Sequence, residues 1–177
     1  MKSIKVYIVN AFANKRTFKG NPAAVCPLER WLPDDLMQSI AFENNLSETA
    51  FLINKKDKFF LRWFTPKVEI DLCGHATLAS AHIIYSEMNY KSDYIEFNIK
   101  SGDVLTVNRN GNLLTMNFPA YEPKIVNHSL EELYSAFGVR PTLFLYCKYG
   151  LVVFNNEEEI IKIVPNLNII EKLPYDG

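Results

Sequence analysis

Apolar and polar residues alternate along much of the chain with the two-residue period of β-strands. Near the N-terminus, Ile4, Val6 and Ile8 fall on one face of such a segment. The pattern predicts strands over residues 4–11, 47–53, 59–64, 94–99, 104–108, 113–118, 142–148 and 151–154, with a short extended segment over 68–72. A further strand follows the turn at Gly20 and is expected to stop at Pro27. The turn sequence Arg109-Asn-Gly-Asn112 predicts a hairpin.

Other segments follow the 3.6-residue period of a helix. Residues 33–45 begin with proline and two acids, which is typical of a helix start. Residues 129–138 carry a capping box and a glycine that suits a helix C-cap. Residues 74–88 are apolar on nearly every side, as expected of a buried helix. A shorter helix is predicted over 157–164, and residues 167–173 fit neither element clearly.

Composition narrows the class of protein. The chain has 177 residues, 48% of them hydrophobic, which is enough for one domain or two small ones. Its net charge is −1 and its basic residues are scattered, so we expect no nucleic-acid partner. No apolar run reaches the ~18 residues that span a bilayer, and the N-terminus lacks a signal-peptide core. We therefore expect a cytoplasmic protein without a membrane partner.

Cysteines and histidines give no ligand pattern. The residues concerned are Cys26, Cys73, Cys147, His75, His82 and His128. Only Cys73 and His75 lie close together in the sequence, and the spacing fits neither a disulfide framework nor a zinc motif, so no metal site is expected. Cys26 and Cys147 lie in apolar runs and are expected to pack as small hydrophobic residues. His82 is expected in the core, and His128 in solvent.

Two places carry candidate chemistry. Glu48 precedes an apolar strand, where partial loss of solvent would suit a general base, although on spacing alone a solvated strand-end acid is the simpler interpretation. Gly74 and His75 open the buried helix, whose free N–H groups and positive end suit a substrate carboxylate. His75 could exchange a proton near neutral pH, or it could simply cap the first turn. Cys73 could be a thiol activated by the helix N-terminus, or a small buried residue.

These segments together resemble the PhzF-like isomerase family of phenazine biosynthesis, which has a diaminopimelate-epimerase-like fold. The motifs cover the first half of the chain densely and stand in the family's order. They are Val9-Asn-Ala-Phe12, Phe18-Lys-Gly-Asn-Pro-Ala-Ala-Val-Cys26, Asn45-Leu-Ser-Glu-Thr-Ala-Phe51, Arg62-Trp-Phe-Thr-Pro66 and Asp71-Leu-Cys-Gly-His-Ala-Thr-Leu-Ala-Ser-Ala81.

The resemblance implies an α+β fold with two similar halves, each a sheet curled round a central helix, and an active site between them. It implies that Glu48 is the catalytic acid/base and that His75 assists it. The expected substrate contacts are Cys73, Gly74, Ala76 and Asn21. Family members isomerise or epimerise without cofactor or metal, and many form homodimers, so the expected partners are a small anionic metabolite and a second copy of the chain.

Two departures from the family pattern qualify this expectation. Asn10 stands where the family usually has an acid. The family's second half carries an Asp-Pro-Val-Thr-Gly type turn, which this sequence lacks. With a linker over residues 119–123, we expect a first domain over 1–119 and a truncated, partial second domain over 128–177, and we expect the isolated chain to be inactive.

Two alternatives stay open. One is a two-thiol racemase with Cys73 as one base, for which Cys147, expected in mid-strand, is the only candidate partner in the second half. The other is an inactive fragment whose unpaired strand edges make it at most a dimer or a binding module.

Overall fold

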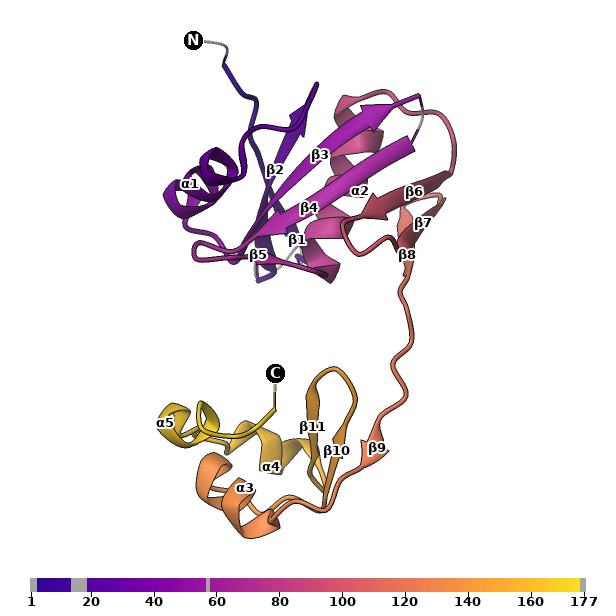
Figure 1. The fold of residues 1–177 in the computed structure, drawn as a ribbon. Helices are drawn as coiled ribbons and strands as arrows, with labels where there is room; N and C mark the ends of the chain where they lie inside the picture. Colours follow the sequence, from indigo (N-terminus) through magenta and orange to yellow (C-terminus); the bar gives the residue numbers. More distant parts are fainter. Residues whose placement is uncertain (1–2, 14–18, 57, 176–177) are drawn as a thin grey trace. The chain divides into compact units, whose positions relative to one another are not determined.

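The structure is a computed structural model that describes residues 3–13, 19–56 and 58–175. Phe18, the first residue of one sequence motif, lies outside these ranges. The chain forms two compact units, residues 1–118 and 119–177, each with its own sheet (Figure 1). Among the described residues, no helix combines the length and the apolar character needed to cross a membrane.

The first unit is a mixed sheet with two helices. Its described strands are β1 (Tyr7–Ala11), β2 (Asn21–Leu28), β3 (Glu48–Lys55), β4 (Lys58–Phe64), β5 (Glu69–Ile70), β6 (Tyr94–Ile99), β7 (Val104–Asn110) and β8 (Leu113–Asn117). They lie in the order β1-β2-β3-β4-β6-β7-β8, with β5 paired to β4. Helix α1 (Asp34–Asn44) connects the parallel strands β2 and β3, and α2 (Gly74–Glu87) precedes β6, which is parallel to β4.

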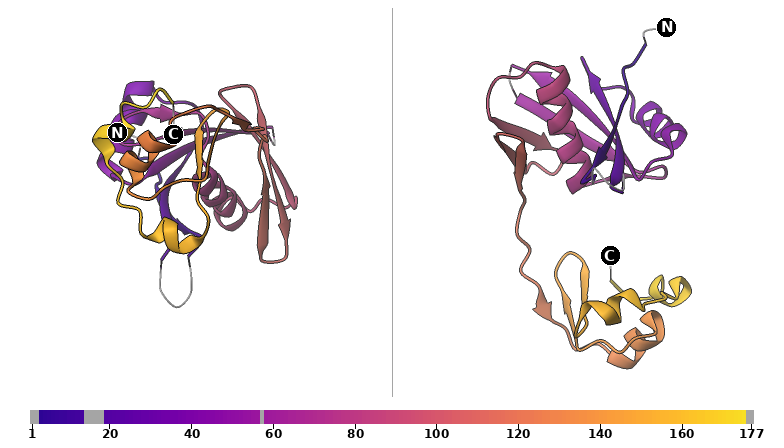
Figure 2. Two further views of the ribbon diagram at one scale, coloured as in Figure 1. Left: turned by 90° about the horizontal axis from the view of Figure 1, so that it is seen from below. Right: turned by 180° about the vertical axis from the view of Figure 1, so that it is seen from behind.

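Alternation along the strands divides side chains between the two faces of this sheet. On β3, Ala50 and Leu52 belong to the core around α2, whereas Phe51 packs with Met37 and Ala41 of α1. The two helices therefore cover opposite faces, as the two views show (Figures 1 and 2). Residues from β6, β7 and both edge strands join the core around α2, so the sheet curls. The α+β class predicted from the sequence is confirmed.

The helix expected over residues 74–88 is confirmed, and its polar residues explain how it tolerates burial. Thr77 donates its hydroxyl to the carbonyl of Cys73 at 2.6 Å, and Ser80 donates to Ala76 at 2.7 Å. Both hydroxyls are buried, and each is satisfied within the helix itself. One face of α2 remains exposed to solvent, at His82 and at Ser86 one turn later. The expectation that His82 lies in the core is therefore wrong.

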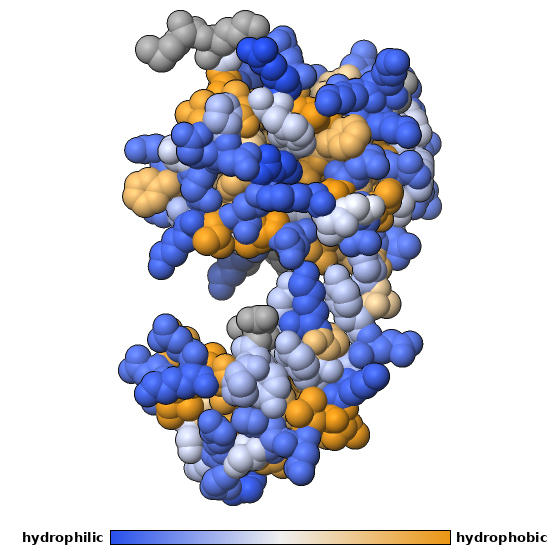
Figure 3. Space-filling view, in the orientation of Figure 1, coloured by the Kyte–Doolittle hydropathy of each residue, from blue (hydrophilic) through white to orange (hydrophobic). Residues whose placement is uncertain are grey.

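The second unit has a smaller sheet and three short helices among its described residues. The elements are β9 (Lys124–Ile125), α3 (Leu130–Phe137), β10 (Leu143–Tyr146), β11 (Gly150–Val153), α4 (Glu157–Ile161) and α5 (Leu167–Ile170). The caps predicted for α3 are present: Ser129 accepts from the N–H of Glu132, and Gly138 adopts the left-handed conformation with φ 71°. Many apolar side chains of this unit remain at its surface (Figure 3).

Three further expectations need correction. The strand β2 does not stop at Pro27 but runs on to Leu28. Beyond Val25 it pairs only with β3, so the missing proline N–H need not break a second ladder. Cys147 lies in the hairpin turn after β10, not in mid-strand, and it is only partly buried. The side chain of His128 is 11% exposed, because it packs against Phe144 and Tyr175.

Candidate active site

The fold brings the N-terminus of α2 to the start of β3. Glu48 is the first residue of β3 and pairs with Ala23 of the parallel strand β2. Cys73 is the N-cap residue of α2, and His75 is the second residue of that helix. The site thus joins two segments that are far apart in the sequence, one with Glu48 and one with Cys73 and His75.

In this site, the imidazole of His75 lies against both other side chains. Its Nε2 is 3.1 Å from Oε2 of Glu48, and its Nδ1 is 3.4 Å from Sγ of Cys73. The side chains of Glu48 and His75 are 15% and 11% exposed, and Cys73 is buried. The structure therefore places together the two residues that the resemblance identifies as catalytic.

The contact between Glu48 and His75 lacks the alignment of a hydrogen bond. Oε2 of Glu48 and Nε2 of His75 are both buried, and neither makes a hydrogen bond to the described part of the chain. A buried polar atom without a hydrogen bond costs folding free energy. A third group that pairs with either atom would recover part of this free energy. One donor atom from each of Glu48, Cys73 and His75 lies within 4.8 Å of the others, which makes these three the candidate ligands if a metal binds here.

Burial has a larger effect on the pKa of the Cys73 thiol than the N–H groups at the helix N-terminus have. Loss of solvent raises the pKa of its thiol to about 12, and the nearby Glu48 acts in the same direction. The backbone N–H groups of Ala76 and His75 oppose this rise but do not outweigh it. Of the two interpretations that the sequence leaves open for Cys73, this environment favours the small buried residue over the activated thiol. Because a protonated thiol can donate to Nδ1, a neutral imidazole would carry its own proton on Nε2, facing Glu48.

The expected substrate contacts divide into two kinds. Asn21 lies in β2 and accepts a hydrogen bond at 3.1 Å from Ser47, the neighbour of Glu48, so its side chain lies at this end of the sheet. Ala76 is fully buried, and its backbone N–H lies against the sulfur of Cys73. A Cβ at Gly74 would lie 3.7 Å from Phe118, an ordinary contact, so space does not require glycine there.

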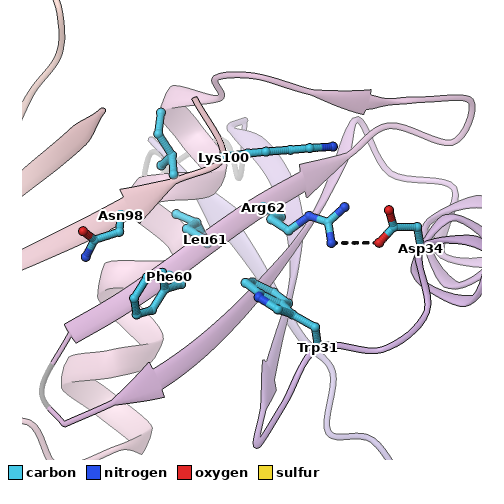
Figure 4. Close-up of a pocket in the computed structure, with 8 residues that line it drawn as sticks. Trp31, Asp34, Phe60, Leu61, Arg62, Asn98 and Lys100 are labelled. Atoms are coloured by element: carbon cyan, nitrogen blue, oxygen red, sulfur yellow. Dashed lines mark hydrogen bonds and ion pairs between the residues drawn. The ribbon is translucent and has the colours of Figure 1, made fainter. Parts of the chain in front are cut away.

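A separate cavity of about 300 Å³ lies on the α1 side of the first unit (Figure 4). Arg62 is at its centre, with ion pairs to Glu69 at 2.7 Å and to Asp34 at 2.9 Å. Its guanidinium also lies over the ring of Trp31, 5.5 Å from the centroid. The two carboxylates that neutralise its charge belong to different elements, Asp34 to α1 and Glu69 to β5. We therefore interpret Arg62 as a structural residue that links these elements. Sequence reasoning missed this role, although Arg62 opens one of the matched motifs.

Comparisons with known proteins find relatives that match almost the whole chain. The family model described as phenazine biosynthesis-like protein matches residues 9–177. An uncharacterised isomerase of Pseudomonas aeruginosa is 42% identical over 174 residues, which cover 98% of this chain and 66% of that protein. The crystal structure of a PhzF-family phenazine biosynthesis protein from Enterococcus faecalis has a TM-score of 0.88 and 40% identity, covering 99% of this chain and 66% of that chain.

A solved structure with lower sequence identity has the same fold. A predicted epimerase from Pseudomonas aeruginosa has a TM-score of 0.73 at 18% identity, covering 98% of this chain and 68% of that chain, and this shows a common fold alone. The chain spans about two thirds of the length of these proteins.

Proposed function

Because the chain belongs to the phenazine biosynthesis-like protein family, we propose that it carries the acid/base group of an isomerase or epimerase. The reaction is a proton transfer on a small anionic substrate, with Glu48 as the group that takes and returns the proton. The observation that carries this proposal is the pairing of Glu48 with His75 at the N-terminus of α2, where Nε2 and Oε2 are 3.1 Å apart.

The chemistry follows from the surroundings of Glu48. The carboxylate is mostly withdrawn from water, and its Oε2 is buried against His75. The 15% of the Glu48 side chain that stays exposed is the part that can meet a C–H or O–H of a substrate. A protonated His75 stabilises the Glu48 carboxylate, and the imidazole can pass a proton onward. Free N–H groups in the first turn of α2 would hold the anionic group of the substrate.

Deuterium uptake from D2O tests this role even though the substrate is unidentified. The complete reaction is not expected of the isolated chain, but exchange of a substrate C–H needs only the one base. The 177-residue chain is therefore incubated with a pool of small carboxylic acids, and mass spectrometry detects C–H positions that exchange. Glu48→Gln is expected to lower uptake at least about hundredfold, in the range of general acid/base contributions. His75→Gln is expected to lower it less, since the histidine assists.

The matched control is Glu43→Gln, which removes an exposed carboxylate from α1 and should leave uptake unchanged. Uptake that survives in Glu48→Gln would refute the proposal. The same result combined with loss of uptake in Cys73→Ser would favour the two-thiol mechanism. The raised pKa of Cys73 argues against that mechanism, because almost none of the thiol is ionised at neutral pH.

A further inference from the structure

The candidate active site has a second possible role, metal binding. The spacing of its residues Glu48, Cys73 and His75 in the sequence does not reveal this role. We propose that these three side chains bind a thiophilic divalent cation of the Zn²⁺ and Cd²⁺ class, with the fourth coordination position open. Sequence spacing predicts no metal site because only Cys73 and His75 are close along the chain. The third donor comes from β3 through the fold.

The donor set and its geometry fit such an ion. Zinc prefers thiolate, imidazole and carboxylate ligands, and three protein ligands with one open position are typical of its catalytic sites. With Zn–S of about 2.3 Å and Zn–N of about 2.0 Å, two tetrahedral ligands lie about 3.5 Å apart. Sγ of Cys73 and Nδ1 of His75 are 3.4 Å apart. One ligand atom from each of the three residues lies within 4.8 Å of the others. Oε2 of Glu48 lies 3.1 Å from Nε2, the other nitrogen of the ring, so the carboxylate has to turn toward Cys73 to share an ion bound at Nδ1.

Charge balance also favours the ion. A dication with one thiolate, one carboxylate and one neutral imidazole has a formal charge of zero, so little charge has to be buried. The hydrogen on the thiol leaves as a proton when the S–metal bond forms, and no oxidation or reduction takes place. Oε2 of Glu48 and Nε2 of His75 make no hydrogen bond to the described residues, so few existing contacts have to break.

Release of this proton gives binding a characteristic pH dependence. The ion competes with a proton on Cys73, whose neighbours with charge or titratable groups at this site are Glu48 and His75. Because each bound ion displaces one proton from a thiol, affinity is expected to rise with pH wherever the free thiol is protonated. Bound metal would also occupy Glu48, so under the proposed function it is expected to inhibit. Binding itself does not depend on that function.

Cadmium titration of the purified 177-residue chain tests the proposal directly. We expect one Cd²⁺ per chain and an ultraviolet thiolate-to-cadmium charge-transfer band. Calorimetry with Zn²⁺ in two buffers of different ionisation enthalpy should show about one proton released per ion. Cys73→Ser should abolish the band, and His75→Gln and Glu48→Gln should each weaken binding at least about tenfold.

Two matched variants remove the same chemical groups elsewhere. Cys147→Ser removes a partly exposed thiol outside the site, and His82→Gln removes an exposed histidine of α2, so both should leave the titration unchanged. A band that persists in Cys73→Ser, or that disappears in Cys147→Ser, would overturn the assignment. Circular dichroism checks that each variant is folded. The proton count on the unmodified chain is independent of any variant, and its absence would equally refute the site.

Discussion

The three cysteines differ sharply in what surrounds them. Burial raises the pKa of Cys26 and that of Cys73 to about 12 each. Cys147 lies in the turn between β10 and β11 and is partly exposed. Thiols react as thiolates, and both ionisation and access are therefore restricted at two of the three positions.

A chromogenic disulfide reagent should distinguish these thiols at pH 8. In the native chain we expect Cys147 to react first and the other two to react at least about a thousandfold more slowly, because so little of each is ionised. All three should react at once in denaturant. The fast phase should vanish in Cys147→Ser and persist in Cys73→Ser. A fast phase that depends on Cys73 would show that its thiol is more accessible and more acidic than the structure indicates.

The candidate site shows which residue-level features the sequence can predict. The resemblance alone distinguishes Glu48 as a base among the 20 acidic residues, since its spacing also fits a solvated strand end. Its contact with His75 depends on how α2 packs against β3, which no local pattern contains. Exposure of His82 and burial of His128 were both mispredicted, because each depends on packing rather than on neighbouring residues.

At the scale of elements, Arg62 joins α1, β4 and β5. It donates from Nε and Nη2 to the two carboxylate oxygens of Glu69, and from Nη1 to Asp34. These hydrogen bonds, together with Lys100, hold the pKa of Glu69 below its usual range despite partial burial. The two-residue strand β5 has little pairing of its own, so this link fixes the segment that leads into α2.

Glu69→Gln should therefore destabilise the first unit by about 1–2 kcal/mol at pH 7. The substitution removes the negative charge from the bidentate ion pair with Arg62, which is largely shielded from water. A folded-state pKa below the unfolded value of about 4.3 means that the stabilisation is fully present above that pH. It is lost as pH falls through the lower folded pKa. Chemical denaturation at pH 7 and at lower pH measures this difference.

Glu43→Gln serves as the control, because it makes the same chemical change at an exposed position of α1 and should shift stability little at either pH. A penalty for Glu69→Gln that stays constant down to pH 3 would contradict the electrostatic explanation.

Most elements of the first unit follow from their own pattern, and their ends do not. The periodicity predicts α2 and β6 within a residue because burial is regular along each. The strand β2 runs through Pro27 because the proline lies where only β3 is adjacent, and local rules cannot know which neighbours a strand has. The sequence equally cannot show that α4 ends at Ile161, since apolar residues continue beyond it to Val164.

At the scale of the whole molecule, the two units differ in how much apolar surface they bury. Both described core clusters lie within residues 1–118. Among the described residues of 119–177, the buried apolar side chains are Leu133, Ala136, Pro141 and Phe144. Large apolar side chains remain exposed there, at Ile125, Ile160, Ile161, Val164 and Leu167. A segment of about 60 residues with so small a core is expected to be marginal by itself.

Residues 119–177 should consequently open before the first unit does. Native-state hydrogen exchange read by mass spectrometry should give opening free energies at least about 2 kcal/mol lower for peptides of α3 and β10 than for peptides of β3 and β4, since local stability follows buried apolar contact. The fragment 1–118 should keep its thermal transition within a few degrees of the corresponding transition of the longer chain. Equal protection in both units, or collapse of the fragment, would mean that the second unit stabilises the first beyond what the core of each unit accounts for.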